Sequence, residues 1–242
     1  MTGALFQPIF GLDLPHGRCV GVALPGSESA SGLPEEEQRH AATLPEARRA
    51  TWVGGRMALH AALADLSIEA GPILSTPRGA PQLPAGARGS ISHKETLAVA
   101  LAARADGNHD VWHLGIDIER VAPGRLDISK RVLRPEELAR LPPPEDPRRV
   151  EELAFAFSAK EAIYKALDPF IARYVSFQEV AVERSADGTA SATLDLREGD
   201  AAAFEVNVRW LRYGDFIITT AHVSTAHVSA LPVPSPRLRE EG

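Results

Sequence analysis

The stretch Gly115–Arg120 reads Gly-Ile-Asp-Ile-Glu-Arg, a glycine followed by two carboxylates that alternate with two isoleucines. Successive side chains of a β-strand point to opposite faces, so Asp117 and Glu119 share one face and Ile116 and Ile118 share the other. Neighbouring carboxylates repel each other unless a cation lies between them, and hard oxygen ligands suit Mg²⁺ or Mn²⁺ better than zinc. The pattern therefore predicts either an edge strand whose polar face meets water or part of a metal site.

Composition limits the classes of protein that fit this chain. Its 242 residues, 44% hydrophobic and 24% charged, suit one large globular domain or two modest ones. The formal net charge of −6 argues against general nucleic-acid binding, which needs an excess of Lys and Arg. Cys19 is the single cysteine and cannot form an internal disulfide, which indicates a reducing compartment. Without a signal peptide or a membrane-length apolar run, we expect a cytoplasmic protein that binds neither nucleic acid nor membrane.

Hydrophobic periodicity and turn residues predict a mixture of helices and strands. Residues 90–119 are predicted to form strand, turn and strand, which would bring Ser92, His93 and the carboxylate pair into one sheet. The proline- and glycine-rich segment 72–89 is too irregular for a helix or an inner strand. Elsewhere we expect a strand over residues 18–24, helices over 45–66, 127–140 and 147–167, and hairpins over 180–196 and 204–223.

The predicted helix over residues 45–66 carries Arg49 and Arg56, which are seven residues apart and so project from nearly the same side. Such a pair either grips a phosphate or forms a solvated cationic face. The same helix contains Gly54 and Gly55, although a glycine in mid-helix costs about 1 kcal/mol relative to alanine. That cost fits the close approach of a ligand or of another chain segment, or simply tight packing.

A second charged pair, Glu161 and Lys165, is spaced by four residues and shares one face of the predicted helix over residues 147–167. Taken alone, such a pair is a surface salt bridge worth about 0.3–0.5 kcal/mol. The pair lies at the end of the stretch Phe157–Lys165, which reads Phe-Ser-Ala-Lys-Glu-Ala-Ile-Tyr-Lys.

Three segments in this order, residues 79–93 ending in Ser-Ile-Ser-His, then Gly115–Glu119 and Phe157–Lys165, together resemble the 4′-phosphopantetheinyl transferases. The likeness is to the larger, two-lobed bacterial type that serves siderophore, nonribosomal-peptide and polyketide synthases. It departs from the family pattern at Leu83, where tryptophan is common, and at Lys94, where a small residue or cysteine is common. The sequence contains no P-loop, dinucleotide-binding fingerprint, zinc-spaced Cys/His set or nucleophile elbow, which disfavours several other enzyme classes.

The resemblance implies an α+β fold of two similar α/β half-domains related by a pseudo-twofold axis, with the active site in the cleft between them. We expect an N-terminal half over residues 1–112 and a C-terminal half over residues 113–231. The proline-rich, charged residues 232–242 are expected to form a disordered tail. Because one chain contains both halves and can build the whole cleft, we expect a monomer.

Members of this family transfer the 4′-phosphopantetheine group of coenzyme A to a serine hydroxyl of a carrier protein and release adenosine 3′,5′-bisphosphate. By resemblance, Asp117, Glu119 and Glu161 would hold one Mg²⁺, with Mn²⁺ as a possible substitute. Lys165 would contact the phosphate under attack or the leaving oxygen. The expected catalytic residues are therefore Lys165 and two of the metal ligands, Asp117 and Glu161. Glu161 is also the expected base for the serine hydroxyl, either directly or through a metal-bound water, and both routes stay open.

A further set of polar and charged residues is expected to bind coenzyme A, together with Lys165. His93, together with Ser92, would contact the pyrophosphate or the 3′-phosphate. Lys160 would be a further phosphate contact, although it lies about 100° around the helix from Glu161. The 3′-phosphate itself would be bound by a set of arginines, namely Arg49, Arg56 and Arg78.

The expected macromolecular partner is an apo acyl or peptidyl carrier protein, a small acidic helical domain. The segment Ile128–Arg134 has the apolar and basic composition that such a partner needs, or it is an ordinary amphipathic helix covering a sheet. Two alternatives would use the same residues: a Mg²⁺-dependent phosphohydrolase that attacks a nucleotide with water, and a coenzyme A-binding module without chemistry. The sequence does not indicate which carrier protein is served or whether acylated coenzyme A is accepted.

Overall fold

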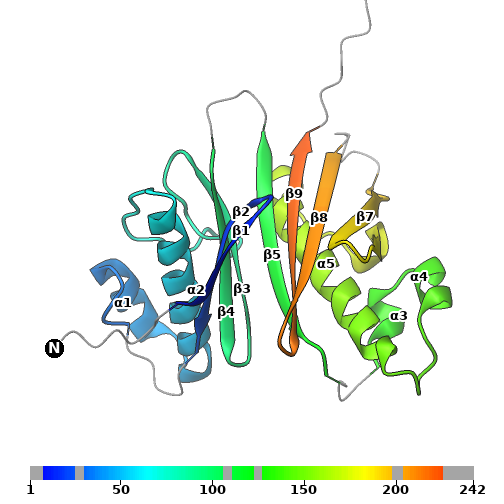
Figure 1. Ribbon diagram of the computed structural model, residues 1–242. Coiled ribbons are helices and arrows are strands. Elements are labelled where there is room, and N and C mark those ends of the chain that lie inside the picture. The colour runs from blue at the N-terminus through cyan, green and yellow to red at the C-terminus, as the bar shows by residue number, and fades with distance from the viewer. Residues whose placement is uncertain (1–7, 25–29, 106–110, 123–126, 198–203, 226–242) are drawn as a thin grey trace, which may run out of the picture.

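Two antiparallel sheets form the centre of the protein, each covered by a long helix (Figure 1). The computed structural model describes residues 8–24, 30–105, 111–122, 127–197 and 204–225. The first sheet has the strand order β1-β2-β4-β3 and the second the order β5-β9-β8-β7-β6. The strands are β1 (Pro8–Leu14), β2 (Gly17–Ala23), β3 (Ala87–Lys94), β4 (Leu97–Arg104), β5 (Trp112–Arg120), β6 (Val180–Arg184), β7 (Thr189–Leu194), β8 (Phe204–Tyr213) and β9 (Phe216–Thr225).

The helices divide between the two sheets, which gives each sheet its own lobe (Figure 1). The first lobe contains α1 (Glu35–Thr43), α2 (Glu46–Asp65) and the sheet β1–β4. The second lobe contains the sheet β5–β9 with α3 (Ser129–Val132), α4 (Pro135–Arg140), α5 (Arg148–Ile171) and the 3₁₀ turn η1 (Phe177–Glu179). Among the described residues, none of the helices is long and apolar enough to cross a membrane. The fold is therefore α+β with two lobes, as the resemblance implies.

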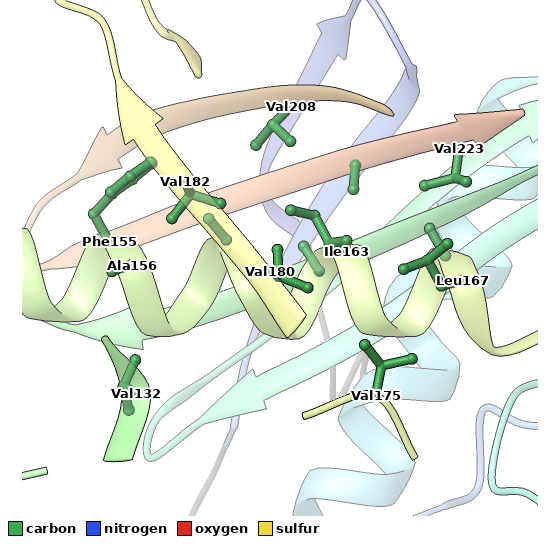
Figure 2. Packing of buried hydrophobic residues seen from close by; sticks show 14 of the residues in the cluster. Val132, Phe155, Ala156, Ile163, Leu167, Val175, Val180, Val182, Val208 and Val223 are labelled. Carbon is green, nitrogen blue, oxygen red and sulfur yellow. The ribbon is translucent and has the colours of Figure 1, made fainter. Parts of the chain in front are cut away.

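Three apolar clusters hold these layers together. One lies between α2 and the first sheet, and another lies between α5 and the second sheet, where Ile163 and Leu167 of the helix meet Val208 and Val223 of the strands (Figure 2). The third lies where the two sheets meet, and it includes residues of β2, β4, β5 and β9. Burial of apolar surface on both faces of each sheet thus fixes the order helix, sheet, sheet, helix.

Strand β5 confirms the alternation expected of Gly115–Glu119. Leu114, Ile116 and Ile118 are at most 3% exposed and belong to the cluster between the sheets. Gly115 lies on the opposite face, where a Cβ atom would come within 1.8 Å of the carbonyl oxygen of Ala162 in α5. Only glycine permits this approach, which sets α5 directly against β5, on the face that also carries the carboxylates.

Close packing also explains the two mid-helix glycines of α2. A Cβ atom on Gly54 would come within 2.1 Å of Leu24, and one on Gly55 within 2.6 Å of Ile91. Of the readings that the sequence left open, the structure favours the close approach of other chain segments and tight packing. The two glycines bring α2 against the sheet that carries β3.

The predicted helices over residues 45–66 and 147–167 and the two C-terminal hairpins are confirmed, but two predictions were wrong. Residues 90–119 do not form one sheet, because β3 is an edge of the first sheet and β5 an edge of the second. The predicted helix over residues 127–140 is divided into α3 and α4, since Leu133 and Arg134 are extended and Pro135 begins a new helix.

The predicted domain limits are only partly covered by the structure. The first sheet ends at Arg104 and the second begins at Trp112, while the division at residues 112 and 113 stays a prediction. The expected tail over residues 232–242 lies outside the described residues.

Candidate active site

A cavity of about 680 Å³ lies between the two lobes. Its wall combines residues of α2, the 75–85 loop and β3 with residues of β5 and α5. Asp168 is the only carboxylate among the described residues of this wall, whereas five cationic side chains line it: Arg48, Arg56, Arg78, Arg88 and Lys165. This excess of positive charge suits a ligand with several phosphate groups.

Asp117 lies beside this cavity at the junction of the lobes and is 5% exposed. Its Oδ1 atom accepts hydrogen bonds from Ser92 Oγ of β3 and from Lys165 Nζ of α5, both at 2.7 Å. Lys165 Nζ also donates to the carbonyl oxygen of Ile116 at 2.9 Å. Strand β5, strand β3 and helix α5 therefore converge on one carboxylate, although β3 and β5 belong to different sheets.

Glu119 and Glu161 complete the group of carboxylates near Asp117. Glu119 Oε2 forms a 2.6 Å ion pair with Lys94 Nζ. Burial raises the pKa of Glu119, and the charge of Asp117 raises it further against the opposing effect of Lys94. The pKa of Glu161 is raised by burial and then by the charges of Asp117 and Glu119. These mutual effects place the three carboxylates within electrostatic reach of one another.

The chemistry of this group fits a hard divalent cation. In the described ranges, no three His, Cys, Asp or Glu side chains are placed closely enough to hold a metal ion. Instead, Lys94 neutralises the charge of Glu119, and Lys165 neutralises that of Asp117. However, Asp117 Oδ2 is buried and has no hydrogen-bond partner within the described part of the chain, and burial and repulsion disfavour the charged forms of Glu119 and Glu161. A cation among these oxygens would relieve both costs, and an all-carboxylate donor set suits Mg²⁺.

His93 follows Ser92 on β3 and lines the cavity. Its pKa is lowered, first by partial burial and then by the positive charge of Lys165. The imidazole is therefore neutral near pH 7 and can donate one N–H to an anion in the cavity.

Two of the three predicted arginines line the cavity. Arg56 is 5% exposed, with its Nε atom donating to Ile73 O at 2.6 Å and its Nη2 atom donating to Ser75 Oγ at 2.8 Å. Arg78 reaches across from the first lobe to Asp168 on α5, with Nε lying 3.0 Å from each carboxylate oxygen. Arg56 is thus held firmly in the wall, whereas Arg78 joins the two lobes at the cavity.

The structure does not bring Arg49 to the cavity. Its guanidinium donates to the carbonyl oxygens of Ala41 and Leu44, both at 3.1 Å, and so caps the end of α1. The neighbouring Arg48 lines the cavity instead and was missed. Arg48, Trp52 and Arg56 are spaced by four residues, which was the available signal, because that spacing also places side chains on one helical face.

Lys160 also lies away from the cavity. It is 1% exposed, and its Nζ atom donates to Val132 O at 2.8 Å, Phe177 O at 3.1 Å and Glu137 Oε2 at 2.5 Å. These three partners use all the donors of the ammonium group. Lys160 therefore ties α3, α4 and η1 to α5, and the structure does not place its ammonium group in the wall of the cavity.

Comparisons with known proteins agree with the order of the motifs. A model of the 4′-phosphopantetheinyl transferase N-terminal domain matches residues 35–103, and a model of the 4′-phosphopantetheinyl transferase superfamily matches residues 113–221. A solved holo-(acyl-carrier-protein) synthase from Bacillus anthracis, in complex with CoA (3′,5′-ADP), aligns with 47% of this chain and 96% of its own, with a TM-score of 0.38 and 22% identity.

Two curated relatives extend the match over the chain. The 4′-phosphopantetheinyl transferase Npt of Nocardia iowensis is 30% identical over 218 residues, which cover 85% of this chain and 96% of the relative. The 4′-phosphopantetheinyl transferase Svp of Streptomyces mobaraensis is 34% identical over 163 residues, which cover 66% of this chain and 64% of the relative. With both family models matched in order and a relative aligned over nearly its whole length, the chain is a transferase that belongs to the 4′-phosphopantetheinyl transferase superfamily.

Proposed function

We propose that this protein transfers the 4′-phosphopantetheine group from coenzyme A to a serine hydroxyl of an apo acyl or peptidyl carrier protein. The reaction depends on Mg²⁺ and releases adenosine 3′,5′-bisphosphate. The observation that carries this proposal is the cationic cavity between the lobes, whose Lys165 bonds directly to Asp117. Coenzyme A carries a pyrophosphate and a 3′-phosphate, so its charge complements that wall, and its reacting phosphate would lie beside the carboxylates.

The cavity residues contact different phosphate groups of coenzyme A. Arg48, Arg56 and Arg78 bind the 3′-phosphate, and Arg78 exchanges Asp168 for that phosphate when coenzyme A enters. His93, neutral near pH 7, donates to the pyrophosphate without adding charge. Lys165 keeps its bond to Asp117 and places a positive charge near the phosphate under attack.

Asp117, Glu119 and Glu161 are the residues that would hold Mg²⁺. When bound, the ion neutralises charge on the pyrophosphate oxygens of coenzyme A. Glu119 gives up its ion pair with Lys94 in this arrangement. Ser92 keeps its hydrogen bond to Asp117 Oδ1, which holds that carboxylate in orientation and leaves Oδ2 free for the cation.

The transfer itself forms one P–O bond and breaks another. The serine oxygen of the carrier attacks the phosphorus next to the pantetheine arm, and the bond from that phosphorus to the bridging oxygen of the pyrophosphate breaks. Adenosine 3′,5′-bisphosphate leaves with the bond electrons. Glu161 takes up the serine proton, either directly or through a water that it holds, because its carboxylate belongs to the group around Asp117, beside the reacting phosphate.

The carrier protein docks on the segment Ile128–Arg134, which follows the metal strand in the sequence. Ile128 is 37% exposed, and Lys130 and Arg131 of α3 are exposed as well. An apolar side chain with basic neighbours complements a small acidic helical domain, and charge attraction of this kind mainly raises the rate of association.

The decisive experiment incubates the protein with coenzyme A, Mg²⁺ and a panel of apo carrier proteins, followed by mass spectrometry of the carriers. We expect a carrier heavier by one 4′-phosphopantetheine group and an equal amount of adenosine 3′,5′-bisphosphate. Nucleotide hydrolysis that needs no carrier would indicate a phosphohydrolase instead. Tight binding of coenzyme A with unchanged mass across the panel would indicate a binding module without chemistry.

Arg48 and Arg49 provide a matched pair for testing the phosphate site. Arg48→Gln is expected to raise KM for coenzyme A by at least about tenfold, because a charge-assisted hydrogen bond contributes about 1.5–3 kcal/mol. Arg49→Gln removes the same charge one residue away, but its guanidinium caps α1, so KM should stay near the wild-type value. Steady-state kinetics with a saturating carrier would measure both, and equal KM values for the two variants would contradict the assignment.

A further inference from the structure

Ile73 has both of its backbone polar groups bound by side chains from elsewhere in the first lobe. Its N–H donates to Glu37 Oε1 of α1 at 2.5 Å, and its carbonyl oxygen accepts from Arg56 Nε of α2 at 2.6 Å. The Ile73 side chain is 1% exposed and belongs to the cluster under α2. The chain is thus held at this point by a carboxylate, a guanidinium and the core together.

Glu37 is unusual because it is a fully buried carboxylate outside the group around Asp117. It is 0% exposed, and its Oε1 atom also lies 2.8 Å from His60 Nε2. Its Oε2 atom has no hydrogen-bond partner among the described residues. A buried charge is costly and stabilises a fold poorly, so a role in placing other groups explains Glu37 better than stability does.

The group that Glu37 influences is Arg56. Burial lowers the pKa of Arg56 to about 10, and the negative charge of Glu37 opposes that shift. The guanidinium also lies over the ring of Trp52, 4.5 Å from its centroid. Glu37, which does not itself line the cavity, therefore supports a buried cation of the cavity wall, while Ile73 links the two side chains through its peptide groups.

Ile73 also lies at the start of the loop that carries Arg78. Ser75 accepts from Arg56 Nη2 at 2.8 Å and forms a β-bridge with Pro81. Between them the loop is closed by the Thr76 N–H, which donates to Ala80 O at 2.8 Å. The position of Ile73 consequently determines where Arg56 and the 75–81 loop stand relative to each other.

We propose that Glu37 is a positioning residue for the 3′-phosphate of coenzyme A, acting through Arg56 and the backbone of Ile73 without touching the substrate. This inference rests on the proposed function. It requires that removal of the charge at Glu37 weakens recognition of the 3′-phosphate and leaves the reacting phosphate in place. The effect therefore falls on KM for coenzyme A and spares kcat.

The test compares Glu37→Gln with wild type, using coenzyme A and 3′-dephospho-coenzyme A as alternative donors. We expect KM for coenzyme A to rise about tenfold, as for loss of one charge-assisted interaction, with kcat changed less than twofold. KM for the dephosphorylated donor should change much less, so the preference for coenzyme A shrinks. Glu36→Gln, on the exposed side of the same helical turn, should match wild type.

Two further measurements make the result decisive. Because Glu37 acts through Arg56, adding Glu37→Gln to Arg56→Gln should have little further effect on KM. Calorimetric titration with adenosine 3′,5′-bisphosphate should show the same loss of affinity without any transfer reaction, which separates this proposal from the proposed function. If Glu37→Gln does not fold, Glu37→Asp takes its place. Aspartate keeps the charge but is one methylene shorter, so the preference for coenzyme A over the dephosphorylated donor should still fall, by less than the change expected for glutamine. Unchanged KM, or an equal rise for both donors, would overturn the proposal.

Discussion

Asp117→Asn is expected to lower kcat for carrier modification by on the order of a thousandfold, because a bound metal ion supplies several kcal/mol of charge stabilisation to phosphoryl transfer. The substitution keeps the shape of the side chain and an oxygen that can accept from Ser92 and Lys165. It removes the negative charge that pairs with Lys165 and would hold the cation. The loss should therefore appear in catalysis without unfolding the protein.

Two readouts test this expectation independently. Single-turnover transfer measures the chemical step, and electron paramagnetic resonance of Mn²⁺ with adenosine 3′,5′-bisphosphate measures the ion without any reaction. Asp187→Asn, in the exposed turn between β6 and β7, is the matched control and should keep both properties. Normal turnover by Asp117→Asn would rule out the metal assignment. Normal Mn²⁺ binding with lost turnover would instead make Asp117 an orienting residue for Lys165.

The sequence predicted the elements of the fold better than their assembly. Periodicity and turn residues identified α2, α5 and both C-terminal hairpins, because these signals depend on the local sequence alone. It also assigned the two faces of β5 correctly. Periodicity reports which face of a strand is buried but not which sheet the strand joins. The edges β3 and β5 lie close together, as the Ser92–Asp117 hydrogen bond shows, yet belong to different sheets.

The sequence likewise predicted some residues of the candidate site and not others. Ser92, Asp117 and Lys165 each lie in a short motif of the resemblance, so the sequence could assign them to one site, and the structure adds the direct contact between Asp117 and Lys165. The arginines were harder to assign, since spacings of seven and eight residues both lie near two helical turns. Choosing between Arg48 and Arg49 requires the position of α1, whose last carbonyl groups bind Arg49. Glu37 could not be predicted, because it stands in the acidic run Glu35-Glu36-Glu37 and only the packing of α1 decides which of these side chains is buried.

Lys160→Met is expected to destabilise the protein by about 3–5 kcal/mol, the usual cost of breaking a buried ion pair. In the Lys160–Glu137 pair the side chains are 1% and 5% exposed, so loss of the ammonium leaves a buried carboxylate without its counter-ion. Urea unfolding at neutral pH measures the change. Lys130→Met, on the exposed surface of α3, should alter stability by no more than about 0.5 kcal/mol.

The double variant Lys160→Met/Glu137→Gln separates the ion pair from the packing of the lysine stem. Glutamine removes the unpaired charge and retains an oxygen for the N–H of Val182, so the double variant should be more stable than Lys160→Met alone. Recovery of this kind requires that Lys160 acts on Glu137 and not on a phosphate. Under folding conditions, KM for coenzyme A should then stay near wild type in Lys160→Met. A large rise in KM without loss of stability would instead place Lys160 at the substrate, which would require α5 to release α3, α4 and η1 when coenzyme A binds.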